Sequence, residues 1–180
     1  MLAQRQTLRG RIGEFLPKKL DLLKVRHHGD LHLGQMLIAK DDVFILDFEG
    51  EPRRSIDERR RKAPAARDLA GLIRSIEYSA GAALQRALKA GPDADGKIGR
   101  ALDQWRDQSV AAALAAYHEF LVDPRLWPSH AEIARRLLDF FLMEKALYEI
   151  EYELAHRPDW VRVPLAGFLR ILSRWEEALA

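Results

Sequence analysis

Two short stretches of the 180-residue chain combine glycines with polar side chains: HHGDLHLGQ at residues 27–35 and DFEGE at residues 47–51. The first stretch places three histidines, an aspartate, a glutamine and two glycines within nine positions. Apolar residues 36–39 and 43–47 separate the two stretches and predict two short strands, joined by a hairpin connection at residues 40–42. Polar groups gathered at the ends of short strands are typical of a functional site rather than a core.

Outside these stretches the chain is predicted to be mainly helical, because Ala, Leu, Arg and Glu are abundant. Apolar residues at steps of three and four predict helices over residues 69–88, 98–121 and 133–154, the last of which should be the longest. An earlier helix is expected over residues 8–16, and a short strand over residues 24–27. We therefore expect a mainly α fold in which a helical body carries a small β-hairpin insert near the N-terminus.

Two helix starts carry specific signals. Ser129 with Glu132 three residues later predicts a capping box at the start of the longest helix. Pro164 is expected to begin the last helix, because proline is favoured in the first turn.

Composition limits the class of protein. With 48% hydrophobic and 31% charged residues, the sequence is typical of a soluble globular protein, and its length predicts one domain over residues 1–180. The longest apolar run, residues 110–117, is far shorter than the roughly 20 residues of a membrane helix, and the N-terminus has no secretory signal. We therefore expect a cytoplasmic protein. The absence of cysteine excludes disulfides and thiolate metal sites.

Two other functions were weighed. The basic run 59–62 suggests nucleic-acid binding, but it follows Asp57 and Glu58 and contains no aromatic residues, so we expect no nucleic-acid partner. The three histidines of residues 27–35 with Asp30 could instead bind zinc in a hydrolase. The other histidines of the chain lie in settings without a matching carboxylate motif, which disfavours that reading. Asp30 taken alone is also compatible with a turn or a helix cap.

The motif spacing favours phosphoryl transfer, which needs a carboxylate to accept the hydroxyl proton and oxygen ligands for Mg²⁺. Kinase catalytic loops contain His-x-Asp, an amide residue five positions after the Asp, and a strand pair that ends in Asp-Phe-Gly. This chain has His28, Asp30, Gln35 and Asp47 at those places, with Glu49 where the general triplet has glycine. The spacing resembles the aminoglycoside-phosphotransferase-like branch of the kinase fold.

Within that branch, several longer strings resemble bacterial maltokinases from about residue 8 to the C-terminus: HGDLHLGQ, LDFEGEP, ERRRK, RDLAG, EKALYEIEYE and RPDW. The resemblance implies the C-terminal lobe of a protein-kinase-like fold, with ATP and Mg²⁺ as cofactors. It implies that Asp30 is the catalytic base, that Gln35 and Asp47 bind Mg²⁺, that His28 orients the loop, and that His32 lies near the transferred phosphate or the sugar. Glu49, which maltokinases also have at this place, is a candidate substrate contact.

Aromatic residues near the C-terminus are candidate sugar contacts. Tyr148 and Tyr152 are four residues apart and share a helix face, and Trp160 follows closely. Packing at the edge of the core is the alternative for these rings. The Arg67-Asp68 pair is expected to bridge the helical body to the catalytic loop. Glu51 and the arginines that follow it are as compatible with a solvated loop as with a role in the site.

The ATP-clamping lobe of a kinase is not recognisable. Only 27 residues precede His28, and Gly10 and Gly13 lie in a helical stretch rather than a strand-borne glycine-rich loop. We expect either a piece of a longer polypeptide, such as a trehalose synthase fused to this kinase, or a truncated gene product.

The expected function follows from the resemblance. It is transfer of the ATP γ-phosphoryl group to the anomeric hydroxyl of maltose, giving maltose 1-phosphate for α-glucan synthesis, with the chain alone inactive. The alternative is a non-catalytic remnant that helps to assemble a trehalose-metabolising enzyme.

Overall fold

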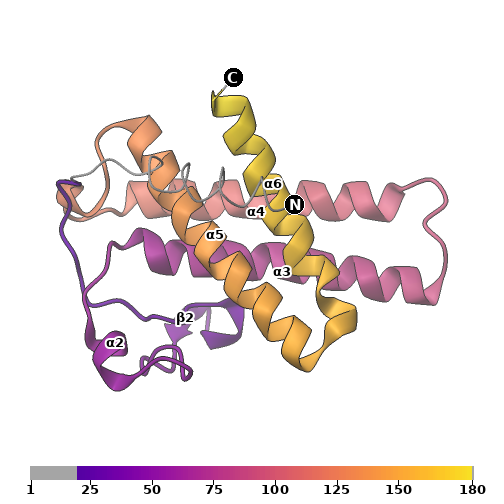
Figure 1. The fold of residues 1–180 in the computed structure, drawn as a ribbon, viewed down its shortest axis with the longest axis horizontal. Coiled ribbons are helices and arrows are strands. Elements are labelled where there is room, and N and C mark those ends of the chain that lie inside the picture. Colours follow the sequence, from indigo (N-terminus) through magenta and orange to yellow (C-terminus); the bar gives the residue numbers. More distant parts are fainter. Residues whose placement is uncertain (1–19, 180) are drawn as a thin grey trace, which may run out of the picture.

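Four long helices form the body of the molecule. The computed structural model describes residues 20–179, with side chains up to residue 174, so the expected helix over residues 8–16 lies outside the described residues. The long helices are α3 (Ala66–Ala90), α4 (Lys97–Glu119), α5 (Ala131–His156) and α6 (Arg162–Leu179). In Figure 1, α3 and α4 run side by side as an antiparallel pair, and α5 crosses them diagonally. The expected mainly helical body is confirmed, and α5, with 26 residues, is the longest described helix.

Shorter elements connect the body to the polar stretches. They are the hairpin strands β1 (Met36–Ala39) and β2 (Asp42–Ile45), the short helix α2 (Ile56–Arg60), and the 3-10 turns η1 (Leu33–Gln35), η2 (Pro124–Leu126) and η3 (Pro158–Trp160). The hairpin and α2 lie together on one side of the body (Figure 1).

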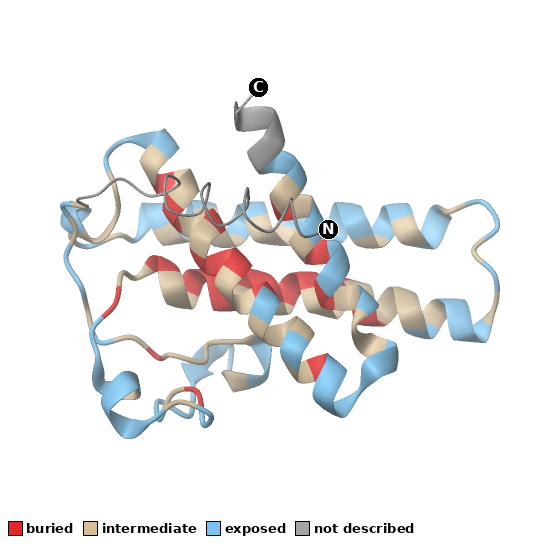
Figure 2. Ribbon diagram, in the orientation of Figure 1, coloured by how far each residue is buried: buried red, intermediate tan, exposed pale blue. Residues whose placement is uncertain are grey.

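The core lies where α5 crosses α3. Ala66 and Ala146 are fully buried there, and their small side chains let the two helices approach closely. Leu137 from α5 is only 2% exposed, and Ile171 from α6 covers the same cluster. Figure 2 shows the buried residues concentrated along this crossing. Burial of these apolar groups is the main stabilising contribution to the body.

The expected apolar stripes of α4 and α5 are only partly correct. No residue of α4 is buried, and Trp105 is 45% exposed, because α4 packs mainly on α3. On α5, Leu147 and Leu154 belong to the apolar spacing that predicts this helix, but both are exposed. The buried face of α5 contains Ala134 and Ala146, which a search for large apolar residues does not detect.

The hairpin has the predicted position with a shorter second strand. Its strands pair antiparallel with Met36 opposite Ile45, so β2 ends two residues before Asp47. Lys40 and Asp41 form the connection with φ angles of 51° and 61°, the conformation of a two-residue type I′ turn. The strand expected at residues 24–27 is reduced to an isolated bridge between Val25 and Ala63.

Both predicted helix starts are shifted. The N-cap of α5 is His130, and no side chain caps the helix, so the capping box at Ser129 is wrong. Glu132 instead forms ion pairs with Arg135 and Arg136 one turn along the helix. Helix α6 begins at Arg162, and Pro164 lies in its first turn, where a missing N–H leaves no hydrogen bond unmade.

Within residues 20–179, no helix has the length and apolar character needed to cross a membrane.

Candidate active site

The HHGD segment is fixed to the body by Asp68, in the first turn of α3. Its two carboxylate oxygens accept the backbone N–H groups of His28, at 2.6 Å, and Gly29, at 2.9 Å. Asp68 is therefore the structural bridge that the sequence predicts. Gly29 has a φ of 87°, and a Cβ there would lie 3.3 Å from the Cα of Gly50, so the two polar stretches meet backbone to backbone.

His28 holds this segment to the end of the hairpin. Its ring is 5% exposed, and Nε2 lies 2.7 Å from the carbonyl oxygen of Leu46. Because a carbonyl can only accept, Nε2 carries the proton, and Nδ1 accepts the backbone N–H of Asp30 at 3.3 Å. This arrangement orients Asp30 and leaves no lone pair of His28 for chemistry.

Asp30 faces α5 across the cleft. Its Oδ1 forms an ion pair of 2.9 Å with Nζ of Lys145, which also lies 3.7 Å from Glu51. The Lys145 ammonium group stands 5.0 Å from the centre of the Tyr148 ring. Sequence reasoning missed Lys145, although its place one helical turn before Tyr148 was an available signal.

Glu51 belongs to the site, so its interpretation as a solvated loop residue is wrong. It is 8% exposed, and its Oε1 accepts a 2.7 Å hydrogen bond from the Tyr148 hydroxyl. Burial and the nearby carboxylate both raise the pKa of Tyr148, which keeps the hydroxyl protonated. The rings of Tyr148 and Tyr152 stack with their centres 6.5 Å apart, and the Arg53 guanidinium lies 5.5 Å from the Tyr148 ring.

Asp30, the two tyrosines and the 3-10 turn after the loop enclose a cleft of about 580 Å³. His32 also lines it, and its Nδ1 accepts the N–H of Gly34. Both tyrosines are half-buried and line the same cleft as Asp30. Glu149 lines the cleft as well, paired with the buried Arg74, and burial raises the pKa of this glutamate.

Three sequence candidates lie outside the cleft. Asp47 and Gln35 are beside each other at the base of the hairpin, where Gln35 Nε2 donates to Asp47 Oδ2 at 2.9 Å. Glu49 is exposed, and its backbone carbonyl accepts a hydrogen bond from Arg59.

Trp160 is also outside. Its ring stacks on Tyr78 at 6.3 Å between ring centres, nearly parallel, and the Arg157 guanidinium lies 5.5 Å from it. Arg157 lines the cleft, so Trp160 supports a cleft residue rather than facing the cleft itself.

Gln35 and Asp47 fit a magnesium ion by their donor atoms. Mg²⁺ is commonly held by one or two protein oxygens together with phosphate and water oxygens, and one carboxylate with one amide meets that requirement once the amide presents its oxygen. Within residues 20–179 no cluster of three or more His, Cys, Asp or Glu side chains is arranged to hold a metal, which disfavours the zinc alternative.

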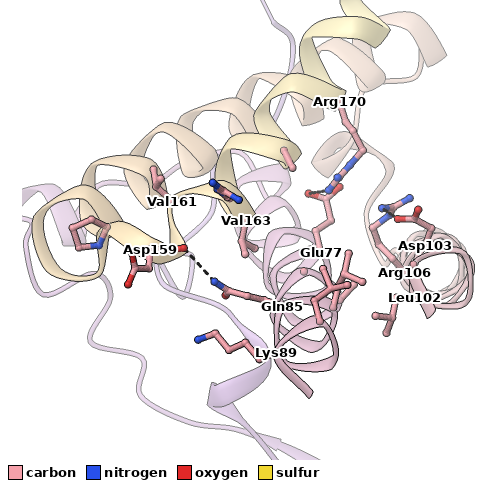
Figure 3. A pocket seen from close by; sticks show the side chains of 18 residues that line it. Glu77, Gln85, Lys89, Leu102, Asp103, Arg106, Asp159, Val161, Val163 and Arg170 are labelled. Carbon is pink, nitrogen blue, oxygen red and sulfur yellow. Dashed lines mark hydrogen bonds and ion pairs between the residues drawn. The ribbon is translucent and has the colours of Figure 1, made fainter. Parts of the chain in front are cut away.

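A larger cavity of about 700 Å³ lies elsewhere, between α3, α4 and the start of α6. Figure 3 shows its wall, with Glu77, Arg106 and Arg170 on one side and Gln85 bonded to the backbone of Asp159 on the other. It contains none of the residues of the polar stretches, so it is not the site that the motifs indicate.

Comparison with known proteins gives a consistent likeness. The chain is 32% identical to glucosamine kinase of Streptacidiphilus jiangxiensis over 137 residues, covering 76% of the chain and 29% of that protein. It is 30% identical to glucosamine kinase of Mycolicibacterium smegmatis over 146 residues, covering 81% of the chain and 34% of that protein. The chain resembles part of a glucosamine kinase.

Solved structures agree. Glucosamine kinase in complex with glucosamine, ADP and inorganic phosphate superposes with a TM-score of 0.67 at 29% identity, over 88% of this chain and 37% of that one. A second glucosamine kinase crystal form gives a TM-score of 0.65 at 28% identity, over 85% of this chain and 35% of that one. The chain thus spans about a third of the length of these relatives. No protein-family model matches it.

These relatives are sugar kinases, as the motif resemblance implies. They are named for glucosamine, however, whereas the motif resemblance implies maltose.

Proposed function

We propose that the chain is the sugar-binding lobe of a kinase that transfers the γ-phosphoryl group of ATP to a sugar hydroxyl. The observation that supports this most is the position of Asp30. A fixed loop holds its carboxylate at the wall of a 580 Å³ cleft lined by two stacked tyrosines. That volume is within the range of about 300–1,000 Å³ usual for small-molecule sites. Aromatic rings beside carboxylates suit a ligand with apolar ring faces and hydroxyl edges.

In this proposal Asp30 is the general base. Its carboxylate accepts the proton of the attacking hydroxyl, the hydroxyl oxygen forms a bond to the γ-phosphorus, and the bond between that phosphorus and the bridging oxygen of ADP breaks. Among the described residues Oδ2 of Asp30 makes no hydrogen bond, so it is available to the sugar, while Lys145 fixes Oδ1. His28 positions the loop, and His32 lies close enough along the cleft wall to contact the sugar or the transferred group.

Gln35 and Asp47 would hold Mg²⁺, which when bound neutralises charge on the nucleotide phosphates. They lie at the base of the hairpin and outside the cleft that the tyrosines line, which suits a nucleotide bound apart from the sugar. Use of ATP would fit the cytoplasmic location expected from the sequence.

The sugar is maltose in one version of the proposal and glucosamine in the other. Maltose rests on the strings that resemble maltokinases, and glucosamine on the relatives that the comparisons find. The two sugars differ in charge, since glucosamine carries an ammonium group. The Lys145 ammonium group in the cleft is paired with Asp30 and lies 3.7 Å from Glu51, so its charge does not discriminate between the two sugars.

The rest of the kinase would cover the hairpin. Leu37, Ile38, Phe44 and Phe48 are each at least half exposed, and an apolar surface of this kind is usual where another domain packs. A missing ATP-binding lobe is the occupant that the kinase reading requires. If the chain is instead fused to a trehalose synthase, or only helps to assemble a trehalose-metabolising enzyme, that partner would pack on the same surface.

The test is an ADP-release assay with ATP and Mg²⁺, offered maltose or glucosamine. We expect negligible turnover by the 180-residue chain, because the nucleotide-binding half of the reaction is not provided. A polypeptide that joins the chain to an ATP-binding lobe should phosphorylate one of the two sugars. Robust turnover by the chain alone would contradict the single-lobe reading, and no turnover of either sugar by the joined polypeptide would contradict the kinase proposal.

In the active polypeptide, Asp30→Asn should lower kcat by about 10²–10⁴-fold, the usual value of general-base catalysis. Tyr152→Ala should raise KM for the sugar more than KM for ATP, since it removes only part of the sugar platform. Phe120→Ala is the aromatic control, because Phe120 is 75% exposed and does not line the cleft, so the sugar KM should be unchanged. If the Asp30→Asn variant kept the wild-type kcat, the general base would be another residue.

A further inference from the structure

A small cavity behind the catalytic loop is surrounded by cations. It measures about 220 Å³ and is lined by the backbone of Gly29 and Gly50 and by five basic side chains: Arg54, Arg59, Arg61, Lys62 and Arg67. It shares no lining residue with the sugar cleft. The basic run 59–62, which sequence reasoning set aside as a nucleic-acid patch, supplies three of the five.

The acidic groups nearby do not balance this charge. Glu58 is the one carboxylate in the cavity wall, and its Oε2 already accepts both the N–H and the hydroxyl of Ser55 in the capping box of α2. Arg54 and Arg67 share a single oxygen of Glu144, at 3.0 and 2.8 Å. Arg61 and Lys62 form no ion pair with any described residue. The cavity wall therefore has an excess of positive charge, which attracts an anionic ligand.

Arg59 supplies a second, independent indication. Its Nη1 donates a hydrogen bond to the carbonyl oxygen of Glu49, but its buried Nε has no hydrogen-bond partner among the described residues. A buried donor without a partner is rare in folded proteins and costs about 1–3 kcal/mol. A guanidinium edge with an unused N–H is the group that binds phosphate oxygens best.

From this geometry we infer that the cavity is a binding site for a phosphate dianion, either free inorganic phosphate or the phosphoryl group of a small metabolite. Its volume is about seven times the ~30 Å³ that one water occupies, enough for a tetrahedral oxyanion with some of its hydration. It is below the range of about 300–1,000 Å³ for whole small-molecule ligands, which excludes a complete nucleotide. The bound anion lies beside the Arg59 guanidinium and neutralises Arg61 and Lys62.

The site has a structural consequence for the catalytic loop. Gly29 and Gly50 line the cavity and belong to the two polar stretches, so an anion there ties α2 to both of them. His27 also lines the cavity. Burial is the main cause that lowers the pKa of its imidazole, Arg67 and Arg54 lower it further, and the nearby Asp68 carboxylate opposes them. A dianion close to that ring raises the same pKa, which gives a local signal of occupancy.

The experiment is a calorimetric titration of the 180-residue chain with inorganic phosphate, with NaCl adjusted to keep ionic strength constant. Arg61→Gln and Lys62→Gln should each weaken binding about tenfold, the value of one hydrogen bond to a charged group. Arg60→Gln is the matched control: the same change within the same basic run, at a residue that does not line the cavity. It should leave binding unchanged. A saturable rise in Tm of about 3–6 °C is expected at ten times the Kd.

Two further arms complete the test. Glucose 6-phosphate, with glucose as its control, distinguishes the sources: equal binding of the sugar phosphate assigns the site to phosphoryl groups in general, and binding of inorganic phosphate alone assigns it to the free anion. Sulfate, which does not titrate near neutrality, should raise the pKa of His27 in an NMR titration. Absence of saturable phosphate binding, or equal weakening by Arg60→Gln, would overturn the inference. Tighter binding of DNA than of phosphate, reduced alike by all three variants, would replace it with a nucleic-acid surface.

Discussion

The crossing of α3 and α5 and the β1–β2 hairpin are both rich in apolar residues, but only the first buries them. Leu137 at the crossing is 2% exposed, whereas Ile38 on the hairpin is 79% exposed and Phe44 is 50% exposed. The same residue types thus stabilise the body of this chain and contribute little to the hairpin. An apolar pattern predicts that a surface will be covered, but it does not say whether the same chain covers it.

Directional polar contacts replace burial around the hairpin. Asp68 accepts two backbone N–H groups of the loop, His28 bonds to Leu46, and Ser75 of α3 accepts the N–H of Leu33 at 3.0 Å. Such contacts fix positions well but each adds only about 1 kcal/mol net. The site region should therefore open locally at a lower free energy than the body.

The largest expected effect concerns Arg74, a buried cation of the body. Arg74 is 1% exposed between Glu77 and Glu149, so Arg74→Met removes the ion-pair partner of Glu149 and leaves Glu77 with only the 3.9 Å contact to Arg170. The free energy of unfolding should fall by about 3–5 kcal/mol in urea titrations at pH 7. Adding Glu77→Gln and Glu149→Gln should recover much of this loss. If the triple variant were no more stable than Arg74→Met alone, lost packing rather than uncompensated charge would be the cause.

Next in size is a matched pair of deletions that tests the contrast directly. Leu137→Ala should lower the free energy of unfolding by about 2–5 kcal/mol, because it leaves a cavity in the core. Ile38→Ala should change it by less than about 0.5 kcal/mol. Chemical denaturation of both variants measures the difference. A cost for Ile38→Ala comparable to that of Leu137→Ala would show that the hairpin is covered in solution.

A smaller effect is expected from Asp68→Asn, which removes a charge and replaces one acceptor oxygen by a donor. The N–H groups of His28 and Gly29 then share one acceptor, at a cost of about 1–3 kcal/mol. Hydrogen exchange should speed up at residues 28–30 and remain slow in α3 and α5. Uniform acceleration across all helices would mean that the loop and the body unfold as one unit.

The smallest effect is a pH dependence from His27. Burial holds the pKa of the folded imidazole below its ordinary value of 6.5, so the unfolded chain binds a proton that the folded chain does not. The contribution of His27 to the free energy of unfolding is complete above pH 6.5 and decreases as the pH falls below 6.5. His27→Gln should reduce the slope of the free energy of unfolding against pH between pH 6.5 and 5. The reduction corresponds to less than one bound proton and is measured by denaturation at several pH values. An unchanged slope would assign the dependence to carboxylates elsewhere.

Helical periodicity predicted the body well because its signal is local. Helices α3 and α4 end at Ala90 and Glu119, each within two residues of the predicted bound, and the type I′ turn lies at the predicted polar connection. The failures were set by tertiary contacts. Which face of α5 is buried depends on its angle to α3, and alanines such as Ala146 mark that face without being strongly apolar.

The candidate site was predictable where a motif is contiguous. The spacing of His28, Asp30 and Gln35 identified the loop, and Asp68 was recognised as its anchor. Lys145 and Glu51 were missed because their significance depends on a contact between segments 94 residues apart, and a single sequence does not report such contacts. The phosphate cavity was missed for a related reason: a basic run on a helix indicates a charged surface, and only the fold shows that it encloses a hollow.

The sheet has one more consequence, for the behaviour of the chain at high concentration. Each strand has a single neighbour among the described residues, so each presents an outer edge of backbone donors and acceptors. The charged residues that usually discourage strand addition, Lys40, Asp41 and Asp42, stand at the turn, while the flanking strands carry Leu37, Ile38 and Phe44. Copies of this chain could therefore join edge to edge into a larger intermolecular sheet, and protection of these edges becomes a practical requirement for keeping the chain monomeric.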